Sequence, residues 1–94
     1  MKVRISEQVA AFVKSLAPEP RRKLRLAMKG LAKGQGDIKV LDGPLSTYSR
    51  LRVSDYRIIF FPRNVNEIEC IYAEKRSIVY EIFAAALRET LAKK

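Results

Sequence analysis

The sequence predicts a small α+β domain with a mostly antiparallel sheet. Apolar residues first recur at helical spacing, over residues 7–34, and later alternate at strand spacing, over residues 48–73. A block of helices followed by a block of strands is typical of α+β domains. The chain has 94 residues, which suits one domain with a modest core, so residues 1–94 are expected to form a single domain.

The first half of the chain predicts a strand and a helical hairpin. Residues 2–6 alternate as a short strand does, and Ser6 is a suitable N-cap for a helix over residues 7–16. Two prolines within residues 17–20 interrupt the chain and restart it, because proline is accepted in the first turn of a helix. A second helix over residues 21–34 then completes the hairpin.

The second half predicts the rest of the sheet and a terminal helix. Residues 34–47 are rich in turn formers and are expected to link the helices to the sheet. Three strands are predicted, at residues 48–53, 56–61 and 67–73, followed by a helix over residues 77–94. The predicted order is therefore β-α-α-β-β-β-α, with the N-terminal helical hairpin packed on a four-stranded sheet.

Composition limits the classes of function. The chain has 19 basic and 10 acidic residues, a net charge of +9, which favours a polyanionic partner over a basic surface that is merely soluble. It has no histidine, and the single cysteine, Cys70, can form neither a zinc site nor an internal disulfide. Cys70 is expected to be a buried structural thiol in a cytoplasmic protein, with no signal peptide, membrane span, metal or cofactor.

Three arginines gather at one predicted hairpin. A two-residue loop at Ser54–Asp55 would place Arg52 opposite Arg57, two pairs along the hairpin from Arg50. Because side chains alternate along a strand, the core face would carry Leu51, Val53, Tyr56, Ile58 and Phe60. The opposite face would carry Tyr48, Arg50, Arg52, Arg57, Ile59 and Phe61. Since Arg57 lies away from the core, its removal is expected to open no cavity.

Like charges so close together are destabilising, so the cluster needs an explanation. Glu67 or Glu69 on the next strand could neutralise one arginine, but not all three. A cation cluster beside aromatic rings is also what a site for phosphates and bases requires, because guanidinium groups bind phosphates bidentately and rings stack on bases.

Two further groups of residues are candidates for anion binding. A basic stripe on the second helix, at Arg22, Arg25, Lys29 and Lys33, is either a solvated face or a ridge that follows a nucleic-acid backbone. Lys75 and Arg76 precede the N-terminus of the last helix, where free N–H groups favour anions. Tyr80 follows in its first turn, where it either packs in the core or faces a ligand.

Two stretches together resemble the RelE/ParE superfamily of toxins from bacterial type II toxin–antitoxin modules. They read LDGPLSTYSRLRVSDYRIIFF, at residues 41–61, and IECIYAEKRSIVY, at residues 68–80. The family pattern has a leucine–glycine stretch, an RLR…DYRIIY-like hairpin, an apolar strand, a basic tripeptide and then VY. The resemblance runs over almost the whole chain and implies an acidic antitoxin as partner.

The resemblance also implies roles for residues. RelE-like members cleave messenger RNA in the ribosomal A site, whereas ParE-like members inhibit DNA gyrase and lack the nuclease residues. Arg57 matches the arginine that contacts the scissile phosphate, and Arg50 matches a basic strand residue of the active site. Arg76 belongs to the basic tripeptide, and Tyr80 matches the tyrosine that stacks on or contacts the substrate nucleotide.

The chain departs from the pattern at Lys75, where many active members have histidine. The candidate general base is then Lys75 or Tyr80, with Arg57 and Arg76 as the charge clamp and Arg50 or Arg52 positioning the RNA backbone. We favour a ribosome-dependent mRNA endoribonuclease that leaves 2′,3′-cyclic phosphate ends. The alternatives are a ParE-like gyrase inhibitor without catalysis and a basic domain that acts only within its antitoxin complex.

Overall fold

The computed structural model describes residues 1–75 and Ala85. Along the chain the elements are β1 (Lys2–Ile5), α1 (Glu7–Ser15), α2 (Pro18–Leu31), β2 (Asp37–Val40), the short 3-10 helix η1 (Gly43–Leu45), β3 (Ser49–Val53), β4 (Tyr56–Asn64) and β5 (Glu67–Lys75). The predicted C-terminal helix, with its N-terminal anion site, lies outside the described residues. None of the helices described is both long and apolar enough to cross a lipid bilayer.

The strands form one mixed sheet in the order β1-β5-β4-β3-β2. β1 is parallel to β5, and the other three neighbouring pairs are antiparallel, which confirms the α+β fold with a mostly antiparallel sheet. The predicted strand count was wrong, because β2 lies inside the segment expected to be a linker. Ile38 and Val40 do alternate with Asp37 and Lys39, but the strand has only four residues, all exposed at the sheet edge, and it follows turn-forming residues, so the segment was read as a linker.

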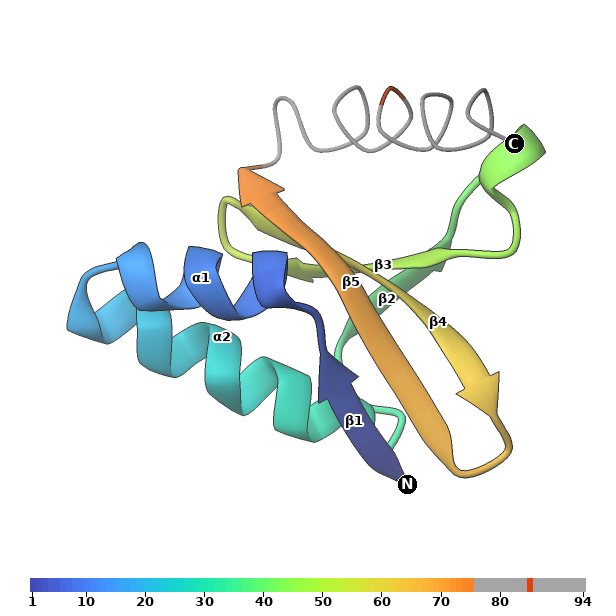
Figure 1. Cartoon of the computed structure of the whole chain (residues 1–94), viewed down its shortest axis with the longest axis horizontal. Helices are drawn as coiled ribbons and strands as arrows, with labels where there is room; N and C mark the ends of the chain where they lie inside the picture. The colour runs from blue at the N-terminus through green and yellow to red at the C-terminus, as the bar shows by residue number, and fades with distance from the viewer. Residues whose placement is uncertain (76–84, 86–94) are drawn as a thin grey trace.

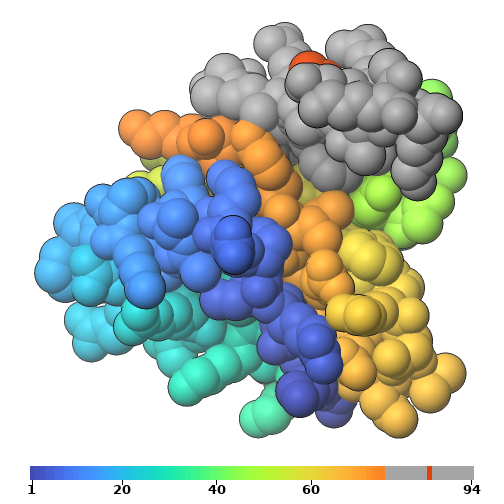
Figure 2. Space-filling view, viewed as in Figure 1, coloured from blue at the N-terminus to red at the C-terminus, as the bar shows by residue number. Residues whose placement is uncertain are grey.

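The two helices cover one face of the sheet, and β1 runs beside β5 (Figure 1). The Ser6 hydroxyl caps α1 by accepting a hydrogen bond from the Val9 amide at 3.2 Å, and it donates one to the Ile71 carbonyl at 2.9 Å. α2 begins at Pro18, earlier than predicted, since proline fits the first turn. In Figure 2 the atoms of these two helices, coloured blue to cyan, lie next to each other on the left of the view.

The main core lies between these helices and the sheet. Its fully buried members come from α1, α2, β3, β4 and β5, and include Val9, Leu24, Leu31, Leu51, Ile58 and Cys70. The predicted burial of Cys70 is confirmed, and burial together with the Glu69 charge raises the pKa of its thiol to about 12. A smaller apolar cluster surrounds Ile59 on the other face of the sheet.

Gly36 joins α2 to the edge of the sheet at a tight point of the core. Its φ of +124° is a conformation that side-chain-bearing residues rarely adopt. A Cβ atom at Gly36 would lie 2.7 Å from Cδ1 of Leu51, a fully buried side chain of the core. Only glycine therefore fits this connection without displacing the core.

Gly36→Ala should lower the free energy of unfolding by about 1–3 kcal/mol, through backbone strain and the clash with Leu51. The control is Gly30→Ala in α2, where the nearest atoms to a new Cβ lie at 3.7 Å. That change should stabilise the chain by about 0.5–1 kcal/mol, because alanine is the better helix former. Urea unfolding of both variants measures the difference, and equal effects would contradict the assignment.

Candidate functional site

The β3–β4 hairpin has the predicted register. Val53 pairs with Tyr56, Arg52 with Arg57, and Arg50 with Ile59. The turn residue Ser54 has a φ of +53°, the left-handed conformation that two-residue hairpin loops require. The hairpin therefore presents one side to the helices and the other to the candidate site, as the alternation predicted.

We call the second side the arginine face, and it consists of three rows of cross-strand neighbours. The first row contains Asp37, Arg52, Arg57 and Glu74. The second contains Lys39, Arg50, Ile59 and Tyr72. The third contains Leu41 and Tyr48, joined by a backbone hydrogen bond of 3.0 Å, with Phe61 beside Tyr48. Rows two residues apart are separated by about 6.6 Å, so the face changes from charged to apolar within about 13 Å.

Arg57 is held rigidly at the charged end of the face. Its Nη1 atom donates to the carbonyl oxygens of Ser54, at 3.0 Å, and Tyr56, at 2.9 Å. Only 8% of the residue is exposed, so the side chain fills a buried space, and the expectation that its removal would open no cavity is wrong. The turn that reverses the chain thus also fixes the guanidinium group in one orientation.

Arg50 and Arg52 share one carboxylate, that of Asp37. Arg50 Nη1 lies 3.2 Å from Asp37 Oδ1 and also donates to the Asp37 carbonyl oxygen at 3.2 Å. Arg52 Nε lies 4.0 Å from Asp37 Oδ2. This acidic partner was missed, because its strand was read as a linker.

The two glutamates considered as partners of the arginine cluster pair with other residues. Glu67 forms an ion pair with Arg4, and Glu69 forms one with Arg63 at 3.0 Å. The pKa of Glu67 is lowered, chiefly by a hydrogen bond from Asn64 and also by the nearby Arg4, while desolvation opposes the shift. The arginine face therefore keeps an excess of positive charge among the described residues.

An open pocket of about 450 Å³ lies on this face. Its described lining consists of Lys39, Val40, Leu41, Asp42, Leu45, Arg50 and Arg57. The lining combines three cations, three apolar side chains and the carboxylate of Asp42, which suits a ligand with an anionic part and a flat apolar part. A pocket of this volume is large enough for a small-molecule-sized group. No cluster of three or more metal-ligating side chains occurs among residues 1–75 and 85.

Two tyrosines lie on the arginine face. The Tyr48 and Phe61 rings meet edge to face, with centroids 5.8 Å apart. Tyr72, in the row of Arg50, was not predicted as a site residue. Burial, with a smaller effect of Glu74, raises the pKa of Tyr72, which makes its hydroxyl a less suitable base at neutral pH than an unperturbed tyrosine.

The remaining predicted catalytic residues lie elsewhere. Lys75 pairs with Tyr56, whose ring packs against the helix-side core, so alternation turns Lys75 away from Arg57. Arg76 and Tyr80 lie outside the described residues. The structure therefore brings Arg50, Arg52 and Arg57 together, and it does not bring Lys75 to them.

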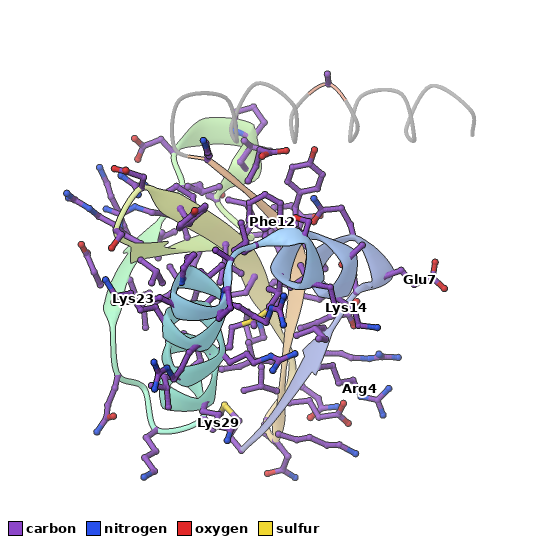
Figure 3. All side chains as sticks on the ribbon, turned by 90° about the vertical axis from the view of Figure 1, so that its left-hand side faces the viewer. Arg4, Glu7, Phe12, Lys14, Lys23 and Lys29 are labelled. Carbon is purple, nitrogen blue, oxygen red and sulfur yellow. The ribbon has the colours of Figure 1, made fainter. Side chains whose placement is uncertain are left out.

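The basic stripe of α2 forms a separate surface. Arg22, Arg25, Lys29 and Lys33 are all exposed, but α2 ends at Leu31 and not at residue 34 as predicted, so Lys33 lies in the turn that follows the helix. The opposite stripe of α2, with Leu24, Met28 and Leu31, packs into the helix-side core. The basic stripe thus lies on the other side of the sheet from the arginine face, and Figure 3 shows Lys29 on this helix.

No family model and no curated relative matches the sequence. The fold is nevertheless similar to that of a chain in the RelB–RelE antitoxin–toxin complex of Methanococcus jannaschii, with a TM-score of 0.66 and 21% identity. That match covers 85% of this chain and 98% of the other. It is also similar to YafQ of E. coli strain BL21(DE3), with a TM-score of 0.63 and 14% identity over 84% of this chain and 97% of YafQ.

A third similar structure is the YoeB/ParE toxin of Agrobacterium tumefaciens, with a TM-score of 0.56 and 17% identity. The match covers 81% of this chain and 99% of that toxin. The chain therefore shares its fold with these RelE, YafQ and YoeB/ParE structures.

Arg57→Ala should lower the free energy of unfolding by about 1–3 kcal/mol, because two carbonyl oxygens lose a charged donor in a buried place. Arg52→Ala removes the same charge from the neighbouring strand, where the side chain is 52% exposed. It should change stability by no more than about 0.5 kcal/mol. Urea unfolding compares the two, and a neutral Arg57→Ala variant would show that the turn contacts contribute nothing.

Proposed function

We propose that the chain is the toxin of a type II toxin–antitoxin module. It acts in the cytoplasm as a ribosome-dependent mRNA endoribonuclease and stops translation and growth. The observation that carries the proposal is the pocket on the arginine face, where Arg50, Arg57 and Lys39 converge. The fold shared with the RelE, YafQ and YoeB/ParE structures supports it.

The proposed reaction is an internal displacement at one phosphate of the messenger. The 2′-oxygen attacks the adjacent phosphorus, the bond from phosphorus to the 5′-oxygen breaks, and the products carry a 2′,3′-cyclic phosphate and a 5′-hydroxyl. A base must take the 2′-proton, an acid must protonate the 5′-oxygen, and cations must stabilise the charge that builds up on the phosphate. No metal or cofactor takes part in this scheme.

Arg57 and Arg76 are proposed to stabilise the charged phosphate. Arg57 is suited to this because its Nη1 contacts hold the guanidinium group before the substrate arrives, so little reorganisation is needed. Arg50 and Arg52 would position the backbone. Of the two candidate bases, Tyr80 is favoured over Lys75, because Lys75 pairs with Tyr56 on the opposite side of the sheet.

The same face offers contacts for a base and for longer RNA. A nucleobase beside the bound phosphate would reach the apolar rows, where Tyr48 lies against Phe61. The exposed stripe of α2, with Arg22, Arg25 and Lys29, and Lys33 in the turn after it, would contact a separate segment of nucleic acid through its phosphates.

The proposed partner is an acidic antitoxin encoded beside this chain. Two of the structural neighbours come from toxin–antitoxin complexes, those of Methanococcus jannaschii and Mycobacterium tuberculosis. The net charge of +9 favours an acidic chain. Carboxylates placed on the arginine face would occupy the same cations as the messenger and so block its access.

The second candidate is a gyrase inhibitor that acts by binding alone. Two observations favour it: the chain has no histidine, and Lys75 is turned away from Arg57. A supercoiling assay with purified gyrase separates it from the first candidate, because a nuclease of messenger RNA leaves that reaction untouched.

Expression of the chain alone in growing bacteria should arrest growth and cut messengers within translated frames. Sequencing of messenger 5′ ends checks this. Arg57→Ala should abolish the cuts, provided that circular dichroism shows a folded protein. Arg50→Gln, at a partly exposed position, serves as a second variant and should reduce the cuts on the order of tenfold or more. Growth arrest without any cut would exclude the nuclease.

Tyr80→Phe tests the base. If the hydroxyl takes the 2′-proton, single-turnover cleavage on messenger-loaded ribosomes should slow by on the order of 10²-fold or more. Tyr56→Phe is the control, because Tyr56 packs on the helix side of the sheet, away from the arginine face. A fully active Tyr80→Phe enzyme would limit Tyr80 to stacking.

A further inference from the structure

The edge strand β2 brings two charged side chains to the arginine face. In the register of the sheet, Lys39 pairs with Arg50 and Asp37 pairs with Arg52, so both lie in rows of the site. Both residues are exposed, and Lys39 also lines the pocket with Arg50 and Arg57. The sequence analysis named neither residue as a candidate for the site.

Lys39 has the position of a phosphate ligand. Residues directly opposite on antiparallel strands have Cβ atoms about 4.5–5.5 Å apart, so Lys39 and Arg50 can reach the same or adjoining phosphate oxygens. Two cations so close repel each other unless an anion lies between them. Within residues 1–75 and 85, the structure gives Lys39 no acidic partner.

Asp37, in contrast, occupies the place that a phosphate would take beside the arginines. Its carboxylate lies 3.2 Å from Arg50 Nη1 and 4.0 Å from Arg52 Nε, where phosphate oxygens would lie in a guanidinium-bound substrate. Arg50 also donates to the backbone carbonyl of Asp37 at 3.2 Å, and that contact does not depend on the carboxylate. Loss of the negative charge would therefore leave Arg50 anchored and make it available to another anion.

We propose that β2 is a wall of the substrate site, in which Lys39 binds a backbone phosphate of the RNA and Asp37 competes with phosphate for Arg50 and Arg52. This inference rests on the proposed function and adds two residues to it. Asp37 keeps the arginine pair ordered in the free protein, and RNA must displace its carboxylate to gain both guanidinium groups. In this proposal Lys39 strengthens RNA binding and Asp37 weakens it.

Binding of a short, fully 2′-O-methylated oligoribonucleotide tests the proposal, because this probe lacks the 2′-hydroxyl and cannot be cleaved. Fluorescence anisotropy at several salt concentrations gives Kd and its salt dependence. Lys39→Gln should weaken binding about fivefold and reduce the slope of log Kd against log salt by about 0.7, the value for one lost phosphate contact on a single strand. Asp37→Asn should tighten binding by a similar factor.

Lys14→Gln is the matched control. It makes the same change in charge at an exposed residue of α1, and this helix lies on the other side of the sheet (Figure 3). Its affinity and slope should equal those of the unchanged chain. If Lys39→Gln and Lys14→Gln have equal effects, net charge explains both and the proposal fails. Weaker binding by Asp37→Asn would overturn its role as a competitor.

The experiment also separates this inference from the proposed function. If the unchanged chain binds the oligonucleotide and only the β2 variants behave otherwise than expected, the β2 assignment fails and the RNA-binding function stands. If the unchanged, folded chain does not bind the oligonucleotide even at low salt, the inference about β2 fails, whereas the proposed ribosome-dependent function is decided separately by the messenger cuts in growing bacteria.

Discussion

The register of the β3–β4 hairpin is the constraint on which the rest of the molecule depends. The two-residue turn at Ser54–Asp55 pairs Arg52 with Arg57 and Leu51 with Ile58. Because side chains alternate, a slip of one residue would send the arginines into the helix-side core and the apolar residues to the site. The core and the candidate site are therefore two consequences of one turn. The same turn supplies the carbonyl oxygen of Ser54 that binds Arg57, so chain reversal, packing and the orientation of a cation are coupled.

The arginine face concentrates positive charge, and the fold compensates for this locally in two different ways. Arg57 is buried and donates to carbonyl oxygens, which satisfies the guanidinium group without adding a negative charge. Arg50 and Arg52 instead share the carboxylate of Asp37 at an exposed edge, where the ion pair is weak and an anion can replace it. Arg57 is thus suited to a fixed role toward a reacting phosphate, and the other two to reversible binding along a backbone.

The two basic surfaces, the α2 stripe and the arginine face, lie on opposite sides of the sheet. They differ in the kind of ligand that each can bind. The α2 stripe is a row of exposed cations on a helix whose other side fills the core, so it can follow a phosphate backbone but offers no pocket. The arginine face combines cations with apolar and aromatic side chains and has a pocket. A single small ligand cannot contact both. A large assembly could contact both at once, and a ribosome carrying a messenger has this size.

The sequence by itself determined the elements that depend on local signals. Helix periodicity, the Ser6 cap and the two-residue hairpin loop predicted both helices and the register of the arginines, because caps, turns and alternation act over a few residues. Burial of Cys70 followed from its apolar strand.

Only the tertiary structure showed β2, since four exposed residues at a sheet edge acquire their strand conformation from pairing with β3. The partnership of Asp37 with Arg50, the approach of Lys39 to the pocket and the orientation of Lys75 away from Arg57 all depend on that pairing or on the pairing of β4 with β5. Contacts between residues distant in the chain are decided by how strands are placed side by side, and no local pattern in the sequence records that placement.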